Sequence, residues 1–291
     1  MIRQNSFALL LMTLALWFGG TPAALASESH DTCARYITSL SASVDAPGTW
    51  CLARNLSSAI ADGAAIYIMA SDVTLDCNGF QLDNLAAGSG TYANGIDIAS
   101  SLQHTTVRHC VVTGFRHGLF DHGGNKLTIE DNHFDRNTTA GIWASSYDTV
   151  VRRNLVSNTN TGTLIAGDPA TRGICVFGSG DIQDNTVAGV VDPIGDSSYI
   201  YGILADLDGG SVEGNRVRGV RTNGSQLVMA IGSLNAVRFT VRDNQVIGDG
   251  SAGVIGLHCA DAHGRSKNNV INGFAIATEN CGDAGGNDIT N

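Results

Sequence analysis

Several features are missing from the sequence, and each absence excludes a class of protein. No segment after residue 26 approaches the roughly 20 apolar residues that a membrane-spanning helix requires. No basic tail or stripe is present, and the formal net charge is −10, which argues against nucleic acid as a partner. No Cys-x-x-Cys and no Cys/His zinc spacing occurs. The sequence leaves the oligomeric state open, and we favour a monomer.

Proline and charged residues are also scarce. The chain has only four Pro, 15% charged residues and 36 Gly among 291 residues. This composition is typical of neither a helical nor a disordered protein. We therefore expect an ordered β-rich domain.

The first 26 residues have the pattern of a secretory signal. Arg3 precedes the apolar stretch FALLLMTLALWF, and small residues at Ala24 to Ala26 predict cleavage before Ser27. Residues 27–60 are predicted to form an N-terminal cap and residues 61–291 the main domain. The mature chain is expected in the periplasm or outside the cell, where disulfides form.

One short phrase recurs along most of the chain. It consists of an aliphatic residue, two polar residues, an asparagine, a small or polar residue and another apolar residue. The phrase begins at Ile129, Val151, Ile182, Val212 and Val241, and the asparagine column, with Cys110 in one copy, has intervals from 22 to 32 residues. Such a variable period predicts a solenoid whose insertions lie between strands.

The apolar columns on either side of the asparagine predict two short strands. The first column holds Leu75, Val107, Ile129, Val151, Ile182, Val212 and Val241, and the second holds Phe80, Val112, Phe134, Val156, Val187, Val217, Val246 and Ile271. An apolar residue between polar neighbours predicts an inward-facing strand position. The asparagine then marks the bend, where it tolerates left-handed backbone and bonds to its equivalents in neighbouring coils.

A third strand precedes each phrase, as in GIWASS at Gly141, GICVFG at Gly173 and GILADL at Gly202. Three strands per coil predict an all-β, right-handed parallel β-helix of about eight coils, about 40 Å long at 4.8 Å per coil. A row of charges beside the first column, from Asp76 and Arg108 to Glu213 and Arg242, has two interpretations. It could be a ligand track, but we favour a solvated ladder of opposite charges.

The phrases PGTWCLARNLS, VTLDCNGFQL and TVRHCVVTGF resemble the entry coils of secreted bacterial proteins of the pectate-lyase-like right-handed β-helix superfamily. The resemblance covers roughly Asp45 to Asn280 and implies the same fold. That superfamily includes polysaccharide lyases, glycosidases, epimerases and proteins with no known catalysis, so the resemblance implies no single activity. The aspartate set of polygalacturonases and the Asp-Pro-His-Asp of mannuronan epimerases are both absent, so no catalytic residue is carried over.

The seven cysteines all follow the expected cleavage point. Cys33 and Cys51 flank the N-terminal segment and could be joined. Cys77 and Cys110 fall at the same corner of adjacent coils, and Cys259 and Cys281 are separated by one minimal coil of 22 residues. We therefore predict these three disulfides, with Cys175 left over.

Long connections after Asn78, Asn154, Asn185 and Asn215 predict loops that wall a groove over the third strand. Its floor would include the proposed substrate-binding residues Phe120, Trp143, Phe177 and Asp206, together with Cys175 and Leu204. Aromatic rings on a rigid sheet could stack on sugars. The alternative is that the loops cover these rings, which then only pack.

Two residues beside this floor are candidates for catalysis. His122 could act as an acid or base near neutral pH, and Arg172 is placed as the base of a lyase could be. The remaining histidines are interpreted as surface residues. The loop acids Asp168, Asp192 and Asp196 could bind Ca²⁺, the only cofactor that we consider.

The sequence thus favours recognition of a carbohydrate polymer along a loop-walled face, and it leaves open whether the protein also cleaves or epimerises that polymer. A non-catalytic exported scaffold or accessory protein is the alternative, because the known catalytic sets are missing.

Overall fold

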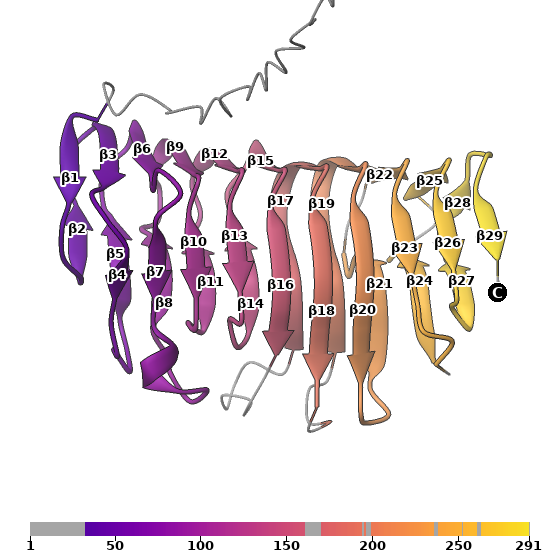
Figure 1. Ribbon diagram of the computed structural model, residues 1–291. Coiled ribbons are helices and arrows are strands. Elements are labelled where there is room, and N and C mark those ends of the chain that lie inside the picture. The colour runs from indigo at the N-terminus through magenta and orange to yellow at the C-terminus, as the bar shows by residue number, and fades with distance from the viewer. Residues whose placement is uncertain are drawn as a thin grey trace, which may run out of the picture.

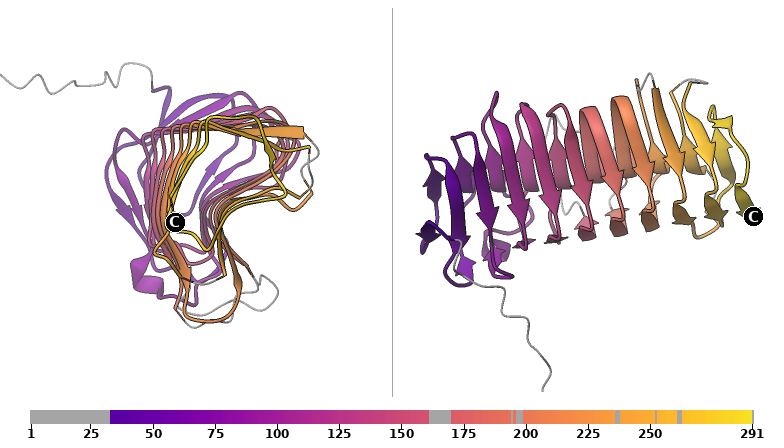
Figure 2. Two further views of the ribbon diagram at one scale, coloured as in Figure 1. Left: turned by 90° about the vertical axis from the view of Figure 1, so that its right-hand side faces the viewer. Right: turned by 90° about the horizontal axis from the view of Figure 1, so that it is seen from above.

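The computed structural model describes residues 33–160, 170–193, 195, 199–235, 238–251, 253–260 and 263–290. Every strand pairing among them is parallel, and the strands wind as a right-handed β-helix (Figure 1). Viewed along the axis, successive coils superpose (Figure 2). The predicted fold class is confirmed. The described residues contain one short 3₁₀ helix, Leu85–Ala87, and no helix able to cross a membrane.

A ten-stranded sheet faces the viewer in Figure 1 and is formed by the strands that follow the corner asparagines. Its members are β4 (Leu56–Ser57), β7 (Gln81–Asp83), β10 (Val111–Thr113), β13 (His133–Asp135), β16 (Leu155–Asn160), β18 (Thr186–Asp192), β20 (Arg216–Thr222), β23 (Gln245–Ile247), β26 (Val270–Asn272) and β29 (Asp288–Thr290). The ten strands extend the expected eight coils by one at each end.

The other sheet contains two rows of strands. The row before the asparagine corner comprises β1 (Arg35–Ile37), β3 (Gly48–Leu52), β6 (Val73–Asp76), β9 (Gln103–Arg108), β12 (Asn125–Glu130), β15 (Thr149–Arg152), β22 (Arg238–Arg242), β25 (Arg265–Lys267) and β28 (Gly282–Asp283). The third-strand row comprises β2 (Ala42–Val44), β5 (Ala64–Ile68), β8 (Asn94–Ile98), β11 (His117–Asp121), β14 (Ala140–Ala144), β21 (Leu227–Gly232), β24 (Val254–His258) and β27 (Ile276–Glu279). The long strands β17 (Ala170–Gln183) and β19 (Tyr199–Glu213) belong to both rows.

The segment predicted as an N-terminal cap contains strands β1 to β4. β2 pairs with β5, β3 with β6 and β4 with β7, all in parallel register. These strands therefore continue the stacking of the later coils toward the N-terminus.

The aliphatic columns form the core. Ile182, Val212 and Val241 pair in register on successive coils and are at most 1% exposed. Ser266 continues this column in the next coil, which agrees with the missing aliphatic residue in the last phrase. In the second column the prediction for Phe80 is wrong: Leu82 pairs with Val112 and is fully buried. The first phrase carries two extra residues around Gly79, which shift the register.

The corner asparagines form a continuous ladder. The Asn154 Nδ2 amide donates to Asn185 Oδ1 over 3.0 Å, and Asn185 Nδ2 donates to Asn215 Oδ1 over 3.0 Å. The ladder runs from Asn132 to Asn269 and ends on Asn287. In these coils the residue with left-handed backbone is the one before the asparagine, as at Asp131 and Asp184, so the left-handed backbone predicted for the asparagine is wrong. The predicted pairing of the asparagine amides is confirmed.

The charged row is a ladder of ion pairs, as favoured from the sequence. Arg108 Nε lies 2.8 Å from Asp76, and Arg242 Nη2 lies 2.6 Å from Glu213. A hydrogen bond from Arg153 holds the pKa of Asp131 below its ordinary value. Because these charges pair across adjacent strands, the row does not present a line of ligand contacts.

All three predicted disulfides are present, joining Cys33 to Cys51, Cys77 to Cys110 and Cys259 to Cys281. Cys175 takes part in no disulfide and is buried. Three disulfides are typical of proteins that fold in an oxidising, exported environment.

The glycine near the start of several third strands, such as Gly173 and Gly202, is explained by close packing. At Gly173 an added Cβ would lie 2.5 Å from the Gly202 carbonyl oxygen and 2.5 Å from Val187 Cγ1. The third strand therefore lies directly against its neighbouring coil, and its outward side chains hold a fixed register.

Candidate functional site

A line of aromatic rings runs along the outer face of the third-strand row. Phe120 on β11 pairs with Trp143 on β14, and their ring centroids are 5.7 Å apart. Trp143 is also 5.4 Å from Phe177 on β17. All three side chains are partly exposed. The structure therefore brings together three of the four predicted substrate-binding residues.

The aromatic line ends in a second apolar cluster outside the coil. Cys175 and Leu204, which were expected on the open floor, are fully buried there with Tyr201, Met229 and Ile255, and Trp143 and Phe177 pack against them. Burial raises the pKa of Tyr201, so its hydroxyl stays protonated. Cys175 and Leu204 are therefore closed to a ligand, while the Trp143 and Phe177 rings stay partly exposed.

Polar side chains border the other end of the line. His122 Nε2 lies 3.0 Å from Asp97 Oδ1. Asn94 Nδ2 donates to Asp97 Oδ2 over 2.7 Å, and Asn94 Oδ1 lies 2.9 Å from His117 Nδ1. These four residues form a connected chain beside the Phe120 ring, which is 4.6 Å from the ring of His122.

Sequence reasoning missed Asn94, Asp97 and His117. Asp97 pairs in register with Phe120, so aligning GIDIAS with GLFDHG on their glycines identifies it as the next floor residue. The interpretation of His117 as a surface residue is wrong: it is 2% exposed and packs 4.8 Å from the Phe120 ring. No period in the sequence predicts that packing.

Together these residues line a cavity of about 510 Å³, which we call the aromatic cavity. Its lining side chains are Asp62, Tyr92, Asn94, Asp97, Arg116, His117, Phe120, His122 and Trp143. The volume lies in the range of small-ligand sites. Flat rings on one side and hydrogen-bonding groups on the other can hold a ring-shaped polar molecule.

Arg172 does not line this cavity. It is 9% exposed, and its guanidinium carbon lies 4.6 Å from the Trp143 ring centroid. Its Nη1 donates to the Ala170 carbonyl over 3.1 Å. The geometry places Arg172 behind the indole, and its role as a base stays a prediction.

Asp206 holds a turn instead of facing the aromatic cavity. Its carboxylate accepts hydrogen bonds from the backbone N–H groups of Leu234 and Asn235 and from Asn235 Nδ2. Asp206 pairs in register with Phe177 on the neighbouring strand, but it does not line the aromatic cavity.

The structure describes one of the three predicted calcium ligands, Asp192. Asp168 and Asp196 lie outside the described residues. Asp192 is fully buried on β18 and accepts a hydrogen bond from Gly195 N over 2.8 Å. No group of three His, Cys, Asp or Glu side chains that could hold a metal occurs where the structure is described. Calcium binding stays a prediction.

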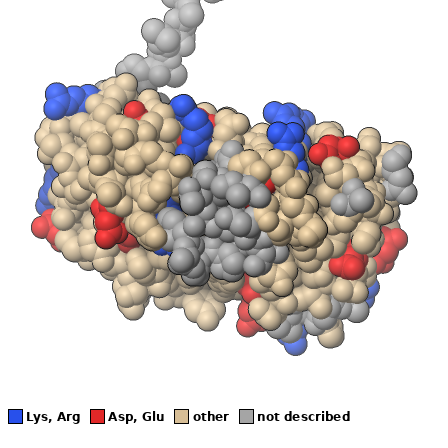
Figure 3. Space-filling view, turned by 90° about the horizontal axis from the view of Figure 1, so that it is seen from below, with Lys and Arg blue, Asp and Glu red and all other residues tan. Residues whose placement is uncertain are grey.

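On the face seen in Figure 3, acidic and basic side chains are scattered among uncharged residues. No continuous basic stripe is visible on the described part of that face. A nucleic-acid backbone would require such a stripe.

Comparison with known proteins gives a family and two structural neighbours. No curated protein matches the chain. One neighbour is the crystal structure of the Dettilon tailspike protein, whose sequence is 14% identical to this chain, with a TM-score of 0.44. The match covers 84% of this chain and 60% of the tailspike chain. The A-module of the Azotobacter vinelandii mannuronan C-5 epimerase AlgE6 is 13% identical with a TM-score of 0.34, and the match covers 90% and 91% of the two chains.

The family model described as the right-handed β-helix region matches residues 54–217, which is more than half of the chain. This range contains the aromatic cavity and most of the asparagine ladder. The protein belongs to the right-handed β-helix family.

Proposed function

We propose that this exported protein binds a carbohydrate polymer at the aromatic cavity. The observation that carries the proposal is the pairing of partly exposed Phe120 and Trp143 with the Asp97–His122 pair in one cavity. Sugar rings have apolar faces and hydroxyl edges. The rings of this cavity suit the faces, and its carboxylate, imidazole and amide groups suit the edges.

The support under the cavity favours binding with little rearrangement. Phe120 and Trp143 lie on paired strands, and Trp143 contacts both the Phe177 ring and the Arg172 guanidinium. Asp97 is held by Asn94. Preformed side chains lose little conformational entropy when a ligand binds.

Replacing Trp143 by alanine should weaken glycan binding by about 1–3 kcal/mol, because the indole supplies the largest ring of the cavity. The measurement is calorimetry with a panel of glycans. Tyr147→Ala is the matched control, since Tyr147 is an aromatic residue that is 56% exposed and does not line the cavity. Equal affinity of wild type and Trp143→Ala for a bound glycan would place the site elsewhere, and no binding at all would favour the scaffold alternative.

The same cavity could support cleavage or epimerisation of a uronic-acid polymer. Both reactions begin when a base removes the C5 proton. In cleavage the C4–O bond then breaks and a C4–C5 double bond forms, with the proton returned to the leaving oxygen; in epimerisation the proton returns to the opposite face. With Asp97 at His122 Nε2, the Nδ1 atom is the position that can accept a proton.

If turnover occurs, His122→Ala should lower kcat by about 10²- to 10⁴-fold and should affect glycan affinity less than turnover. The measurement is absorbance of the unsaturated product and loss of the C5 proton signal, with and without Ca²⁺. Arg172→Ala tests the second predicted base in the same assay. Product formation that is unaffected in His122→Ala would reject the role of His122.

A further inference from the structure

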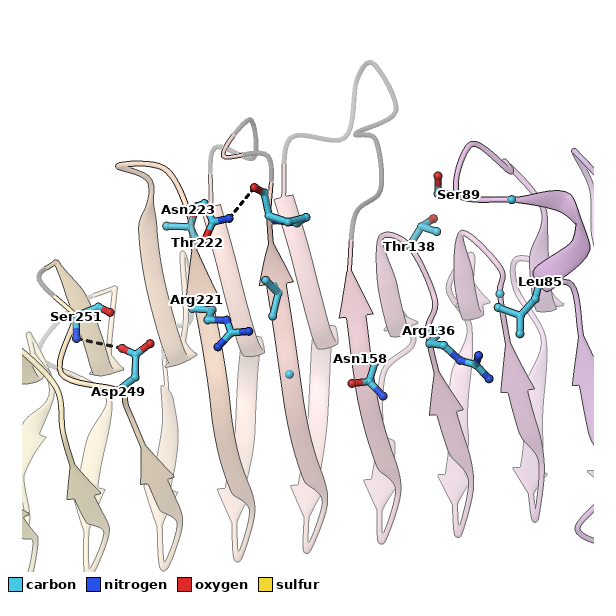
Figure 4. A pocket seen from close by; sticks show the side chains of 15 residues that line it. Leu85, Ser89, Arg136, Thr138, Asn158, Arg221, Thr222, Asn223, Asp249 and Ser251 are labelled. Atoms are coloured by element: carbon cyan, nitrogen blue, oxygen red, sulfur yellow. Dashed lines mark hydrogen bonds between the residues drawn. The ribbon is translucent and has the colours of Figure 1, made fainter.

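A larger cavity, of about 830 Å³, lies on the outer face of the ten-stranded sheet (Figure 4). Its lining begins at Leu85, just after β7, and ends at Asp249 and Ser251, just after β23. Six strand spacings separate β7 from β23, which corresponds to about 29 Å along the helix axis. We call this surface the sheet groove, and its length suits an extended chain better than a compact molecule.

The floor of the sheet groove repeats from coil to coil. The floor positions Gly114, Arg136, Asn158 and Gly189 are equivalent, because each directly follows one of the register partners Thr113, Asp135, Ser157 and Ala188. All four have a positive φ between 51° and 78°. The glycines add no side chain to the floor, whereas Arg136 and Asn158 add polar groups. A ligand with regularly repeating units matches such a surface.

Two guanidinium groups lie in the sheet groove. Arg136 and Arg221 both extend toward the N-terminal coils in Figure 4. Three strand spacings separate β13, which precedes Arg136, from β20, which contains Arg221, so the two residues are about 14 Å apart along the helix axis. The described residues that line the groove include no aromatic ring, so they offer no stacking surface of the kind that a neutral sugar would use.

Arg136 is held in place by its neighbour Asp135. Arg136 Nε and Asn158 Nδ2 each donate to this carboxylate over 2.8 Å. Burial would raise the pKa of Asp135, yet hydrogen bonds from Ser157, Asn158 and Arg136 lower it overall. The Asp135 carboxylate thus fixes the orientation of the Arg136 guanidinium through Nε. The side chain is 54% exposed, so its terminal nitrogens are accessible to a ligand.

Among the described residues that line the groove, Asp249 supplies a carboxylate, and it has its own donors. The backbone N–H of Ser251 donates to Asp249 Oδ1 over 3.0 Å, and hydrogen bonds from Ser251 lower the pKa of Asp249. Asp249 lies at the C-terminal end of the groove, beyond Arg221. The stretch between the two arginines is therefore the part suited to anionic groups.

We propose that the sheet groove is a second glycan site, which binds a linear polysaccharide bearing carboxylates along the helix axis. Arg136 and Arg221 pair with two carboxylates of the same chain, since the planar guanidinium matches a carboxylate. Asn158 lies on β16, between β13 and β20, and its amide bonds to a hydroxyl between the two carboxylates. This site is independent of the aromatic cavity and extends the proposed function to two surfaces.

The overall charge of −10 makes the two arginines decisive. An acidic surface repels a polyanion in general, so specific pairing has to overcome that repulsion. Arg136→Gln and Arg221→Gln should each weaken binding about tenfold, and the double variant should abolish it. The probe is a mixture of oligogalacturonates of 8 to 12 residues, titrated calorimetrically at low salt, with dextran as the neutral comparison.

Arg153→Gln is the matched control. Arg153 is an arginine that is 46% exposed and pairs with Glu130 and Asp131 on the charge ladder, outside the sheet groove. It should bind the oligogalacturonates as the wild type does. Circular dichroism checks that every variant is folded.

Three results would overturn the proposal: no binding by the wild type, equal loss in Arg153→Gln, or loss in Trp143→Ala without loss in the two groove variants. The second result would mean general charge attraction, and the third would move the ligand to the aromatic cavity. Failure of the aromatic-cavity proposal would give a different result. A neutral glycan would bind Trp143→Ala as well as it binds the wild type, while the two groove variants would still lose affinity for the oligogalacturonates.

Discussion

Asn185→Asp should destabilise the fold by about 3–5 kcal/mol, the range for an uncompensated buried charge. Asn185 is 1% exposed. Its Nδ2 donates to the Val151 carbonyl over 2.9 Å and to Asn215 Oδ1 over 3.0 Å. Aspartate keeps the shape but replaces this donor with an oxygen that faces two acceptors. The corner then loses two hydrogen bonds and gains a repulsion.

The measurement is urea unfolding followed by circular dichroism. Asn55→Asp is the matched control, because exposed Asn55 only accepts a hydrogen bond, from the Gln81 N–H over 2.9 Å, and aspartate accepts equally well. This control should change stability by less than about 0.5 kcal/mol. Similar unfolding curves for both variants would mean that the ladder contributes little to stability.

The ladder shows why so much of the fold is predictable from sequence. Each coil repeats the same corner, so a residue type with one physical role recurs in a visible column. The aliphatic and asparagine columns depend only on position in that repeat. The register fails at Phe80, because the extra residues at Gly79 belong to one coil and leave no periodic trace.

The candidate site is predictable only in part. Phe120, Trp143 and Phe177 share a face because their strands are in register, and the repeat contains that information. The burial of Leu204 and the capture of Asp206 by the turn at Asn235 depend on how connections fold over the third strand. Connections differ between coils, so their packing has no period that sequence patterns reveal.

The second large effect on stability is expected when an aspartate replaces an inward-facing strand residue. Val212→Asp should leave no folded protein, because Val212 is fully buried between Ile182 and Val241 on the adjacent coils. An aspartate there has no donor in the column of aliphatic side chains. We expect a loss of more than about 4 kcal/mol, which is exceptional for one substitution.

Gln183→Asp introduces the same residue one coil away, in the outward column. Gln183 pairs in register with Arg152 on one side and Glu213 on the other, so attraction and repulsion nearly cancel at this partly exposed position. Its melting curve, followed by circular dichroism, should match that of the wild type, while Val212→Asp should show no cooperative transition. Cooperative melting of Val212→Asp near the wild-type temperature would contradict the packed column, because a solenoid coil that tolerates a buried carboxylate cannot depend on that column for its stacking.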